Sequence, residues 1–384
     1  MAELAADSRS ADSPPPPMPD DVLREILLRL PPEPIYLFRA SSVSKHWRGL
    51  VHDAGFLLRC REFHGGTPPV LGFFNLTRPP LFVPTSGSFA VSAATMHHGD
   101  WWPLHCHRGR ALLISRRSRA LLVRDLVTGD ERRLPLPPGF EGSWEDNCGT
   151  LCAAGHADNC HCRSCPFLVA FVFSHRCFIT SACLYSSEIG IWGDTTSIYT
   201  PNQLVTRKPT VLVGNMLYCQ LDNNWIIEFD FDAYSLDVIG ELSYRELNSC
   251  VGHIIMPAED GQLGLAGLGD FSLYLWSNIA FIEEGMMVTW QHRRVIDLKK
   301  FLAPEVVAEC AAPVWPIGYA QDADVIFIEV YPSGVYMIHL KSMHIDKVSE
   351  NMTCGGYVCA YTSFYAPGIN TGGGDHQPEL LNGS

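Results

Sequence analysis

Three segments of this 384-residue chain repeat one plan, and this repeat limits the possible folds more than any other feature. In each segment a strand pair with a tight turn is followed by a polar turn and a third strand. The segments are residues 111–134 (ALLISRRSRALLVRDLVTGDERRL), 216–239 (MLYCQLDNNWIIEFDFDAYSLDVI) and 325–348 (VIFIEVYPSGVYMIHLKSMHIDKV). The pattern predicts consecutive small antiparallel sheets.

Weaker copies of the same plan lie at residues 167–193, 264–298 and 70–92. Radial repetition of such units is typical of a β-propeller, whose blades take about 40–50 residues each. The chain after residue 65 is long enough for six to eight blades; six is favoured, with seven or eight as alternatives. Residues 357–364 (YVCAYTSF) are expected to return to the first blade and close the ring, which would remove exposed sheet edges.

The N-terminal part has a different, helical pattern. A first helix is predicted from Asp20 or Asp21, whose side chain is expected to cap it, to a proline pair. A second is predicted at residues 34–40 and a third from Ser41 or Ser42, both with apolar residues at helical spacing. Three such short helices cannot bury all of these side chains by themselves. Either the rest of the chain or a partner protein must cover them.

The run MPDDVLREILLRLPPEPIYLFRASSVSKHWRGLVHD, residues 18–53, resembles an F-box, whose usual form is roughly LPxDxLxEILxRLP…LxRxxxVxKxWxxL. It departs from that form only at Met18, which replaces leucine with a residue of similar size. The resemblance implies docking on a Skp-type adaptor and, through it, on a cullin–RING ubiquitin ligase. Some apolar residues must instead hold the helical core, and sequence does not divide the two sets. The residues expected to contact the adaptor are Pro19, Ile26, Leu27, Leu30, Pro31, Leu37, Val43 and Trp47.

The region after the F-box-like run is similar to the propeller-like F-box-associated domain that is abundant in plants, especially grasses. The phrases FHGGTPPVLGFF, RGRALLISRRSRALLVRDLVTGDERRLPLPPGF, VLVGNMLYCQLDNNWIIEFDFDAYSLDVI and YTSFYAP carry the likeness. Arg124 departs from it, because the family tends to have tryptophan there.

The expected architecture is therefore multi-domain, with a small all-α three-helix F-box followed by a large all-β propeller-like domain. The expected parts are a disordered tail (1–17), the F-box module (18–60), a linker (61–69), the propeller-like domain (70–367) and a flexible C-terminal tail (368–384).

Charge and hydropathy exclude several classes of protein. The 28 basic and 41 acidic side chains give a net charge of −13, which argues against a generic nucleic-acid binder. Arginines between residues 108 and 133 form a local basic excess, interpreted as turns and solvent-facing strand positions. The longest apolar run, residues 167–173, is too short to span a bilayer, and the N-terminus lacks the pattern of a signal peptide. We therefore expect an intracellular protein, cytoplasmic or nuclear or both, with reduced cysteines and no membrane contact.

Two clusters of histidine or cysteine residues are candidates for a metal or catalytic site. The histidines His97, His98, His105 and His107, near Trp101 and Trp102, lack regular periodicity, which favours a loop on a propeller face. The other cluster is a cysteine-rich stretch at residues 148–165, in which some cysteines have the spacing of zinc ligands. The stretch has no hydrophobic core of its own, which favours a loop of reduced cysteines over a metal site. Its zinc candidates are Cys148, Cys152, Cys160, Cys162 and Cys165.

The function predicted from these features is that of a substrate receptor in an SCF-type ubiquitin ligase. No GxSxG, HExxH or GxxxxGK motif occurs, so we expect a non-catalytic subunit without a cofactor. Two alternatives remain: an F-box scaffold that acts outside ubiquitination, and a propeller enzyme or small-ligand binder. The target protein is unknown from sequence, although the acidic body weakly favours basic partners.

Overall fold

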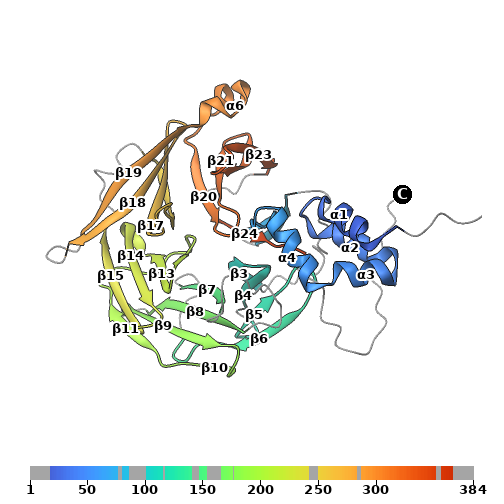
Figure 1. Cartoon of the computed structure of the whole chain (residues 1–384). Coiled ribbons are helices and arrows are strands. Elements are labelled where there is room, and N and C mark those ends of the chain that lie inside the picture. The colour runs from blue at the N-terminus through green and yellow to red at the C-terminus, as the bar shows by residue number, and fades with distance from the viewer. Residues whose placement is uncertain are drawn as a thin grey trace, which may run out of the picture.

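A computed structural model shows a helical module beside a ring of small β-sheets (Figure 1). For residues 147–153, 223, 241, 279–282 and 287–289 it describes the backbone alone. The structure describes residues 18–76, 80–85, 101–115, 117–140, 147–153, 166–175, 177–241, 250–282, 287–351 and 356–365.

The helical module has four helices: α1 (Asp20–Leu28), α2 (Pro34–Val43), α3 (Lys45–Val51) and α4 (Ala54–Phe63). The first three were predicted, but the boundary between the second and third lies at Ser44, whose side chain accepts a hydrogen bond from the Trp47 N–H and caps α3. The predicted cap of α1 by Asp20 or Asp21 is wrong. Neither side chain caps the helix, and the Asp20 carboxylate lies 2.9 Å from the Nε2 atom of His46 instead.

Helix α4 was not predicted, and it extends into the segment expected to be a linker. It begins after Asp53, whose carboxylate accepts the Phe56 N–H at 2.9 Å. It ends before Gly65 and Gly66, which have φ angles of 73° and 71°. Positive φ is favourable for glycine, so this pair ends the helix and turns the chain toward the first strand.

Six blades surround a central axis, as predicted (Figure 1). Blade one contains β24 (Val358–Thr362), β1 (Val70–Asn75) and β2 (Leu81–Pro84); blade two contains β3 (Trp101–His107), β4 (Arg110–Ser115), β5 (Ala120–Arg124) and β6 (Glu131–Pro135). Blade three contains β7 (Asn147–Ala153), β8 (Phe167–Ser174), β9 (Ile179–Ser186), β10 (Ile191–Trp192) and β11 (Thr196–Tyr199); blade four contains β12 (Val211–Val213), β13 (Met216–Gln220), β14 (Trp225–Asp230) and β15 (Ser235–Glu241). Blade five contains β16 (Gly252–Pro257), β17 (Leu263–Gly269), β18 (Ser272–Ile282) and β19 (Met287–Asp297); blade six contains β20 (Trp315–Ala320), β21 (Val325–Val330), β22 (Gly334–His339) and β23 (His344–Ser349).

In the described part of the propeller, the short helical elements are η2 (Asp222–Asn224), η3 (Leu298–Lys300) and α6 (Pro304–Glu309). Blades four and five share one further bridge, a parallel pairing of Glu241 with Met287.

The ring closes by pairing the two ends of the propeller, as predicted. Strand β24 runs antiparallel to β1, with Ala360 opposite Phe73. The fully buried Tyr361 then ties β24 to the next blade, because its hydroxyl donates to the Gly109 carbonyl at 2.6 Å and accepts the Leu126 N–H at 3.0 Å. Every hydrogen bond of this closure joins residues far apart in sequence, so it forms only when the ring is complete.

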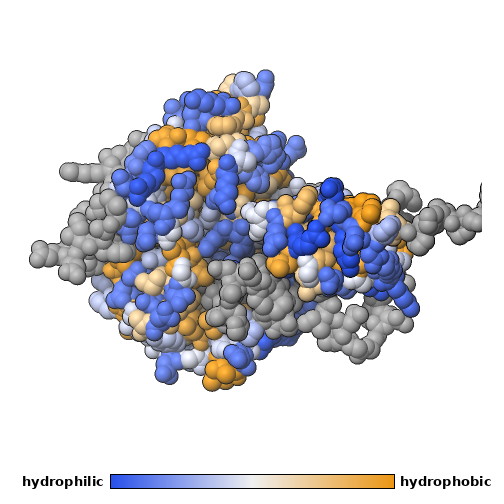
Figure 2. All heavy atoms as spheres, in the orientation of Figure 1, coloured by the Kyte–Doolittle hydropathy of each residue, from blue (hydrophilic) through white to orange (hydrophobic). Residues whose placement is uncertain are grey.

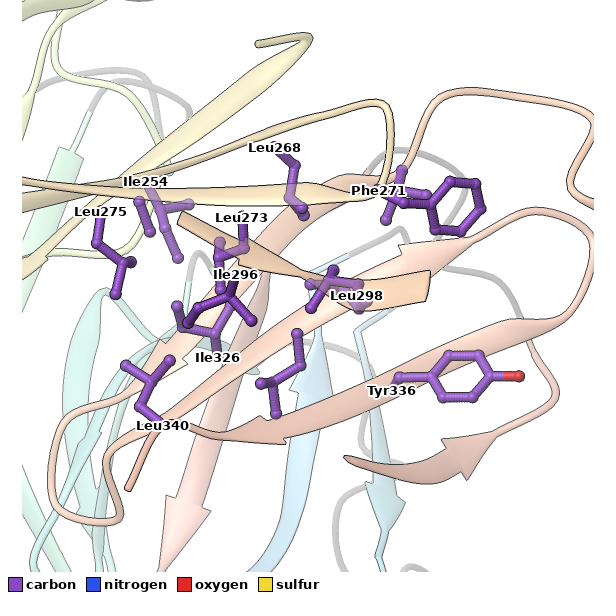
Figure 3. Close-up of a cluster of buried hydrophobic side chains, with 14 of the residues drawn as sticks. Ile254, Leu268, Phe271, Leu273, Leu275, Ile296, Leu298, Ile326, Tyr336 and Leu340 are labelled. Carbon is purple, nitrogen blue, oxygen red and sulfur yellow. The ribbon is translucent and has the colours of Figure 1, made fainter. Parts of the chain in front are cut away.

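The central strands of the blades are buried on both faces, because neighbouring side chains along such a strand point to opposite blade interfaces. In β8, Val169 and Phe171 pack toward blade two, whereas Ala170 and Val172 pack toward blade four. This explains the continuous apolar run of that strand. The interface between blades five and six is drawn in Figure 3; it includes Ile254, Leu268, Phe271, Leu273, Leu275, Ile296, Leu298, Ile326, Tyr336 and Leu340.

The departure at Arg124 is accommodated by an ion pair. The Arg124 side chain is 14% exposed, and its Nη1 atom lies 3.2 Å from the Glu131 carboxylate, directly across the β5–β6 pair.

Candidate functional site

Helices α1 and α2, and Met18 just before α1, expose large apolar side chains that the module does not cover. We call Met18, Val22, Ile26, Phe38 and Val43 the apolar face; they are 52%, 48%, 45%, 45% and 63% exposed. Figure 2 shows hydrophobic residues at the surface of this module, among hydrophilic ones. Single exposed apolar residues are common, but several on two short helices indicate a protein-docking surface.

The inner side of the same helices forms a closed core. Leu27, at 1% exposed, packs among residues of all four helices. Tyr365, which follows the last propeller strand, joins this core, and its hydroxyl lies 2.9 Å from the His52 Nε2 atom. Helix α4 and the end of the propeller therefore cover the inner apolar side chains of the first three helices but not the apolar face. The core contains Leu23, Leu27, Leu28, Leu37, Ala40, Leu50, Val51, Phe56, Cys60 and Tyr365.

The eight residues expected to contact an adaptor fall into three groups. Four are exposed, namely Pro19, Ile26, Pro31 and Val43. Two others, Leu30 and Trp47, are half-buried and pack against the module core, while Leu27 and Leu37 are buried inside it.

In this fold the two buried leucines belong to the core of the module. The sequence-based set omitted Met18, Val22 and Phe38, which are also exposed apolar residues. The four-residue spacing of Val22 and Ile26, which places both on one helix face, was the available signal.

Charged contacts fix the position of α1 in the module. The pairing of Asp20 with His46 brings the first turn of α1 to the α2–α3 junction, next to Val43. Glu25 accepts hydrogen bonds from Arg59 of α4 and from Arg29, and the bond from Arg59 is the largest cause that lowers the pKa of Glu25. Helix α1, which carries part of the apolar face, is therefore held by one polar contact to α3 and another to α4.

A second set of polar residues lies where blades six, one and two meet. Asp322, in the β20–β21 turn, accepts hydrogen bonds from the Arg108 N–H at 2.9 Å and the Thr362 hydroxyl at 3.0 Å, and its other oxygen lies 2.9 Å from His107 Nδ1. Burial alone would raise the pKa of Asp322, but His107 and the two hydrogen bonds hold it well below its usual range. This network ties three blades together at the ring closure.

The loop predicted around the histidine cluster is wrong for the described residues, because Trp101–His107 form β3, the first strand of blade two. Burial and the neighbouring His107 lower the pKa of His105 to about 3, so this imidazole is neutral. Burial and the adjacent Cys359 raise the pKa of the Cys106 thiol. The other two histidines of the cluster, His97 and His98, lie outside the described residues.

The zinc candidates are not placed by the structure. Cys148 and Cys152 lie in β7, of which only the backbone is described, and Cys160, Cys162 and Cys165 lie outside the described residues. Among the described residues, no group of three or more His, Cys, Asp or Glu side chains is arranged to hold a metal ion. None of the described helices is long and apolar enough to cross a membrane.

Comparisons with known proteins bear mainly on the helical module. Residues 17–59 match the family model of the F-box domain, so the chain contains a helical F-box followed by a six-bladed β-propeller. No curated protein matches the chain. Among solved structures, a chain from "Crystal Structure of Mitotic Checkpoint Complex" is similar at 11% identity and a TM-score of 0.33. The alignment covers 63% of this chain and 61% of that chain, and the likeness is too distant to bear on function.

Proposed function

We propose that this protein is the substrate-binding subunit of an SCF-type cullin–RING ubiquitin ligase. The F-box docks a Skp-type adaptor through the apolar face, and the propeller binds a target protein. The chain performs no bond chemistry of its own; it raises the effective concentration of the target at the ligase. An F-box joined to a propeller is an architecture typical of such non-catalytic subunits. We place the protein in the cytoplasm, the nucleus or both, and assign the propeller to the grass-type F-box-associated domains.

The observation that carries this proposal is the apolar face itself. Its five side chains stay 45–63% exposed on an F-box whose core is built from other residues, so the module does not need them to complete its core. Burying a side chain of this size contributes about 1.5–3 kcal/mol, and several together are enough for a stable heterodimer.

The test is co-purification of the full chain with a Skp-type adaptor. The double variant Ile26→Asp with Val43→Asp should lose the adaptor while the chain stays folded, because both side chains are exposed, at 45% and 63%. The matched control is Ile189→Asp with Ile191→Asp, since these residues are 68% and 60% exposed on blade three. Leu27 is unsuitable, because a charge in the core would unfold the module whatever its function.

Adaptor binding by the Ile26/Val43 variant at the wild-type level would refute docking through the apolar face. Ubiquitination of captured target in a reconstituted ligase then separates a substrate receptor from a scaffold that acts outside ubiquitination. A scaffold would bind the adaptor and support no transfer.

A further inference from the structure

The central channel of the propeller contains a pocket that the proposed adaptor docking does not use. Its cavity volume is about 40 Å³. The walls come from β3, from the segment that precedes β12, from the β20–β21 turn and from β24, so four blades contribute. The lining residues used below are Arg207, Lys208, Thr210 and Asp322.

Two cations line this pocket against one carboxylate. The Arg207 guanidinium lies 5.2 Å from the centroid of the Trp102 ring, which holds it at the pocket wall. Asp322 is the carboxylate among the lining residues, and its oxygens are already engaged by the network at the ring closure. It is therefore not placed to neutralise Lys208.

Lys208 has no hydrogen bond or ion pair with any residue that the structure describes. Burial lowers the pKa of its ammonium, and the opposing Asp222 is exposed to solvent. Burial penalises an isolated ammonium unless a counter-charge lies nearby. An anion next to Lys208 would restore that balance.

Two buried polar groups beside Lys208 also lack partners in the described part of the chain. The Thr210 hydroxyl lines the pocket, is 9% exposed as a residue and makes no hydrogen bond. The Nε2 atom of His253 is likewise without a partner, and the charge of Lys208 acts on this imidazole. Burial, and then Lys208, lower the pKa of His253 to about 3, so the ring is neutral and adds no competing charge. A buried polar group without a hydrogen-bond partner is unfavourable, so a bound molecule is expected here.

We infer that the channel pocket binds an oxyanion group, a phosphate or a carboxylate, with Lys208 as its charge partner and the Thr210 hydroxyl as a hydrogen-bond donor. The cavity exceeds the ~10–15 Å³ that one water needs, which leaves room for the oxygens of such a group. Water alone would satisfy the hydroxyl but would not neutralise the ammonium. This binding does not depend on adaptor docking, and it contrasts with the acidic net charge of the chain.

Titration calorimetry and thermal unfolding of the full-length protein test this inference. Sodium phosphate and sodium acetate are each compared with sodium chloride at equal ionic strength. The wild type should bind phosphate, acetate or both saturably and unfold at a higher temperature with the bound anion. Phosphate alone would identify a phosphate group as the ligand chemistry, and acetate binding would show that a carboxylate is sufficient. If neither anion binds more than chloride does, the inference is overturned.

Variants of the pocket locate the site. Lys208→Met should weaken anion binding at least about tenfold, as expected for loss of a hydrogen bond to a charged group. Lys208→Arg should keep binding, and Thr210→Val should weaken it several-fold while preserving the shape of the side chain. The matched control is Lys300→Met, whose side chain is 73% exposed on η3, and it should bind as the wild type does. Equal binding by Thr210→Val and the wild type would overturn the assignment even if Lys208→Met failed to fold.

Discussion

The substitution Asp322→Asn tests whether the polar network at the ring closure holds the propeller together. Asp322 joins the β20–β21 turn of blade six to His107 and Arg108 of blade two and to Thr362 of blade one. Its side chain is 13% exposed and that of His107 is 16% exposed, so water cannot replace the lost contacts readily. Asparagine keeps the shape of the side chain but removes its charge, and one of its two terminal atoms becomes a donor.

The expected loss follows from the burial of this pair. The substitution leaves buried groups that bonded to the carboxylate without a full partner, which typically costs about 1–3 kcal/mol, and the charge of the lost acceptor places this variant near the upper end, at about 3 kcal/mol. The assay is urea unfolding at pH 7, followed by tryptophan fluorescence. The matched control is Asp346→Asn, which also disrupts contacts with histidines, His339 and His344, but at a carboxylate whose side chain is 42% exposed. Its expected cost is at most about 1 kcal/mol, because solvent screens the pair.

The pH dependence of the same variant provides a second measurement. The folded state holds the pKa of Asp322 well below its usual range, so on acidification the unfolded chain takes up a proton first. The stabilisation is fully present above the unfolded pKa of about 3.9 and is lost as the pH falls below it. The difference in unfolding free energy between wild type and Asp322→Asn should therefore shrink from pH 7 to pH 3. A difference below about 0.5 kcal/mol at pH 7, or one that does not change with pH, would refute the reasoning.

Three further perturbations probe other parts of the propeller. Tyr361→Phe removes a hydroxyl that satisfies two backbone groups of blade two, and urea unfolding should show a loss of about 1–3 kcal/mol; an unchanged midpoint would contradict this role. Gly334→Ala should cost more than about 1 kcal/mol in the same assay, because φ is 123° and a Cβ would collide with the Ser349 carbonyl oxygen. Burial is the largest cause that raises the pKa of Glu228, to about 7, so ionisation of this carboxyl destabilises the fold as the pH rises through 7. Glu228→Gln should therefore raise the thermal midpoint at pH 8 but not at pH 4. Equal shifts of the midpoint at the two pH values would argue against a buried, protonated Glu228.

The outer strands of the blades were predictable from sequence, whereas the inner strands were not. The repeats at residues 111–134 and 325–348 correspond to the second, third and fourth strands of their blades. The second and third strands are buried on both faces, and turns separate all three, so their pattern is regular. The first strands face the channel on one side and mix apolar with polar residues, as in WWPLHCH of β3. This mixture resembles a loop, which is why the pocket residues on β3 were assigned to one.

The helices of the F-box were predictable, but the division between core and docking surface was not. Helical spacing shows which residues share a stripe, and it contains no information about what covers that stripe. The cover of the stripe on α1 comes partly from α4, whose pattern was not recognised, and partly from Tyr365, far along the chain. Leu27 and Ile26 are adjacent in sequence, and only the three-dimensional packing makes one a core residue and the other an exposed one.

The F-box is joined to the propeller at the blade that closes the ring, and this has a mechanical consequence. Helix α4 leads into β1 through a short connection, and Tyr365 returns from β24 into the helical core. Because β1 and β24 pair directly, both attachments leave from one sheet, which resists rotation of the module better than a single flexible linker would. If the apolar face docks an adaptor as proposed, a target on the propeller is held in a restricted position relative to the ligase. Restricting that position is what raises the effective concentration of target lysines, so the closure of the ring and the proposed function depend on the same contacts.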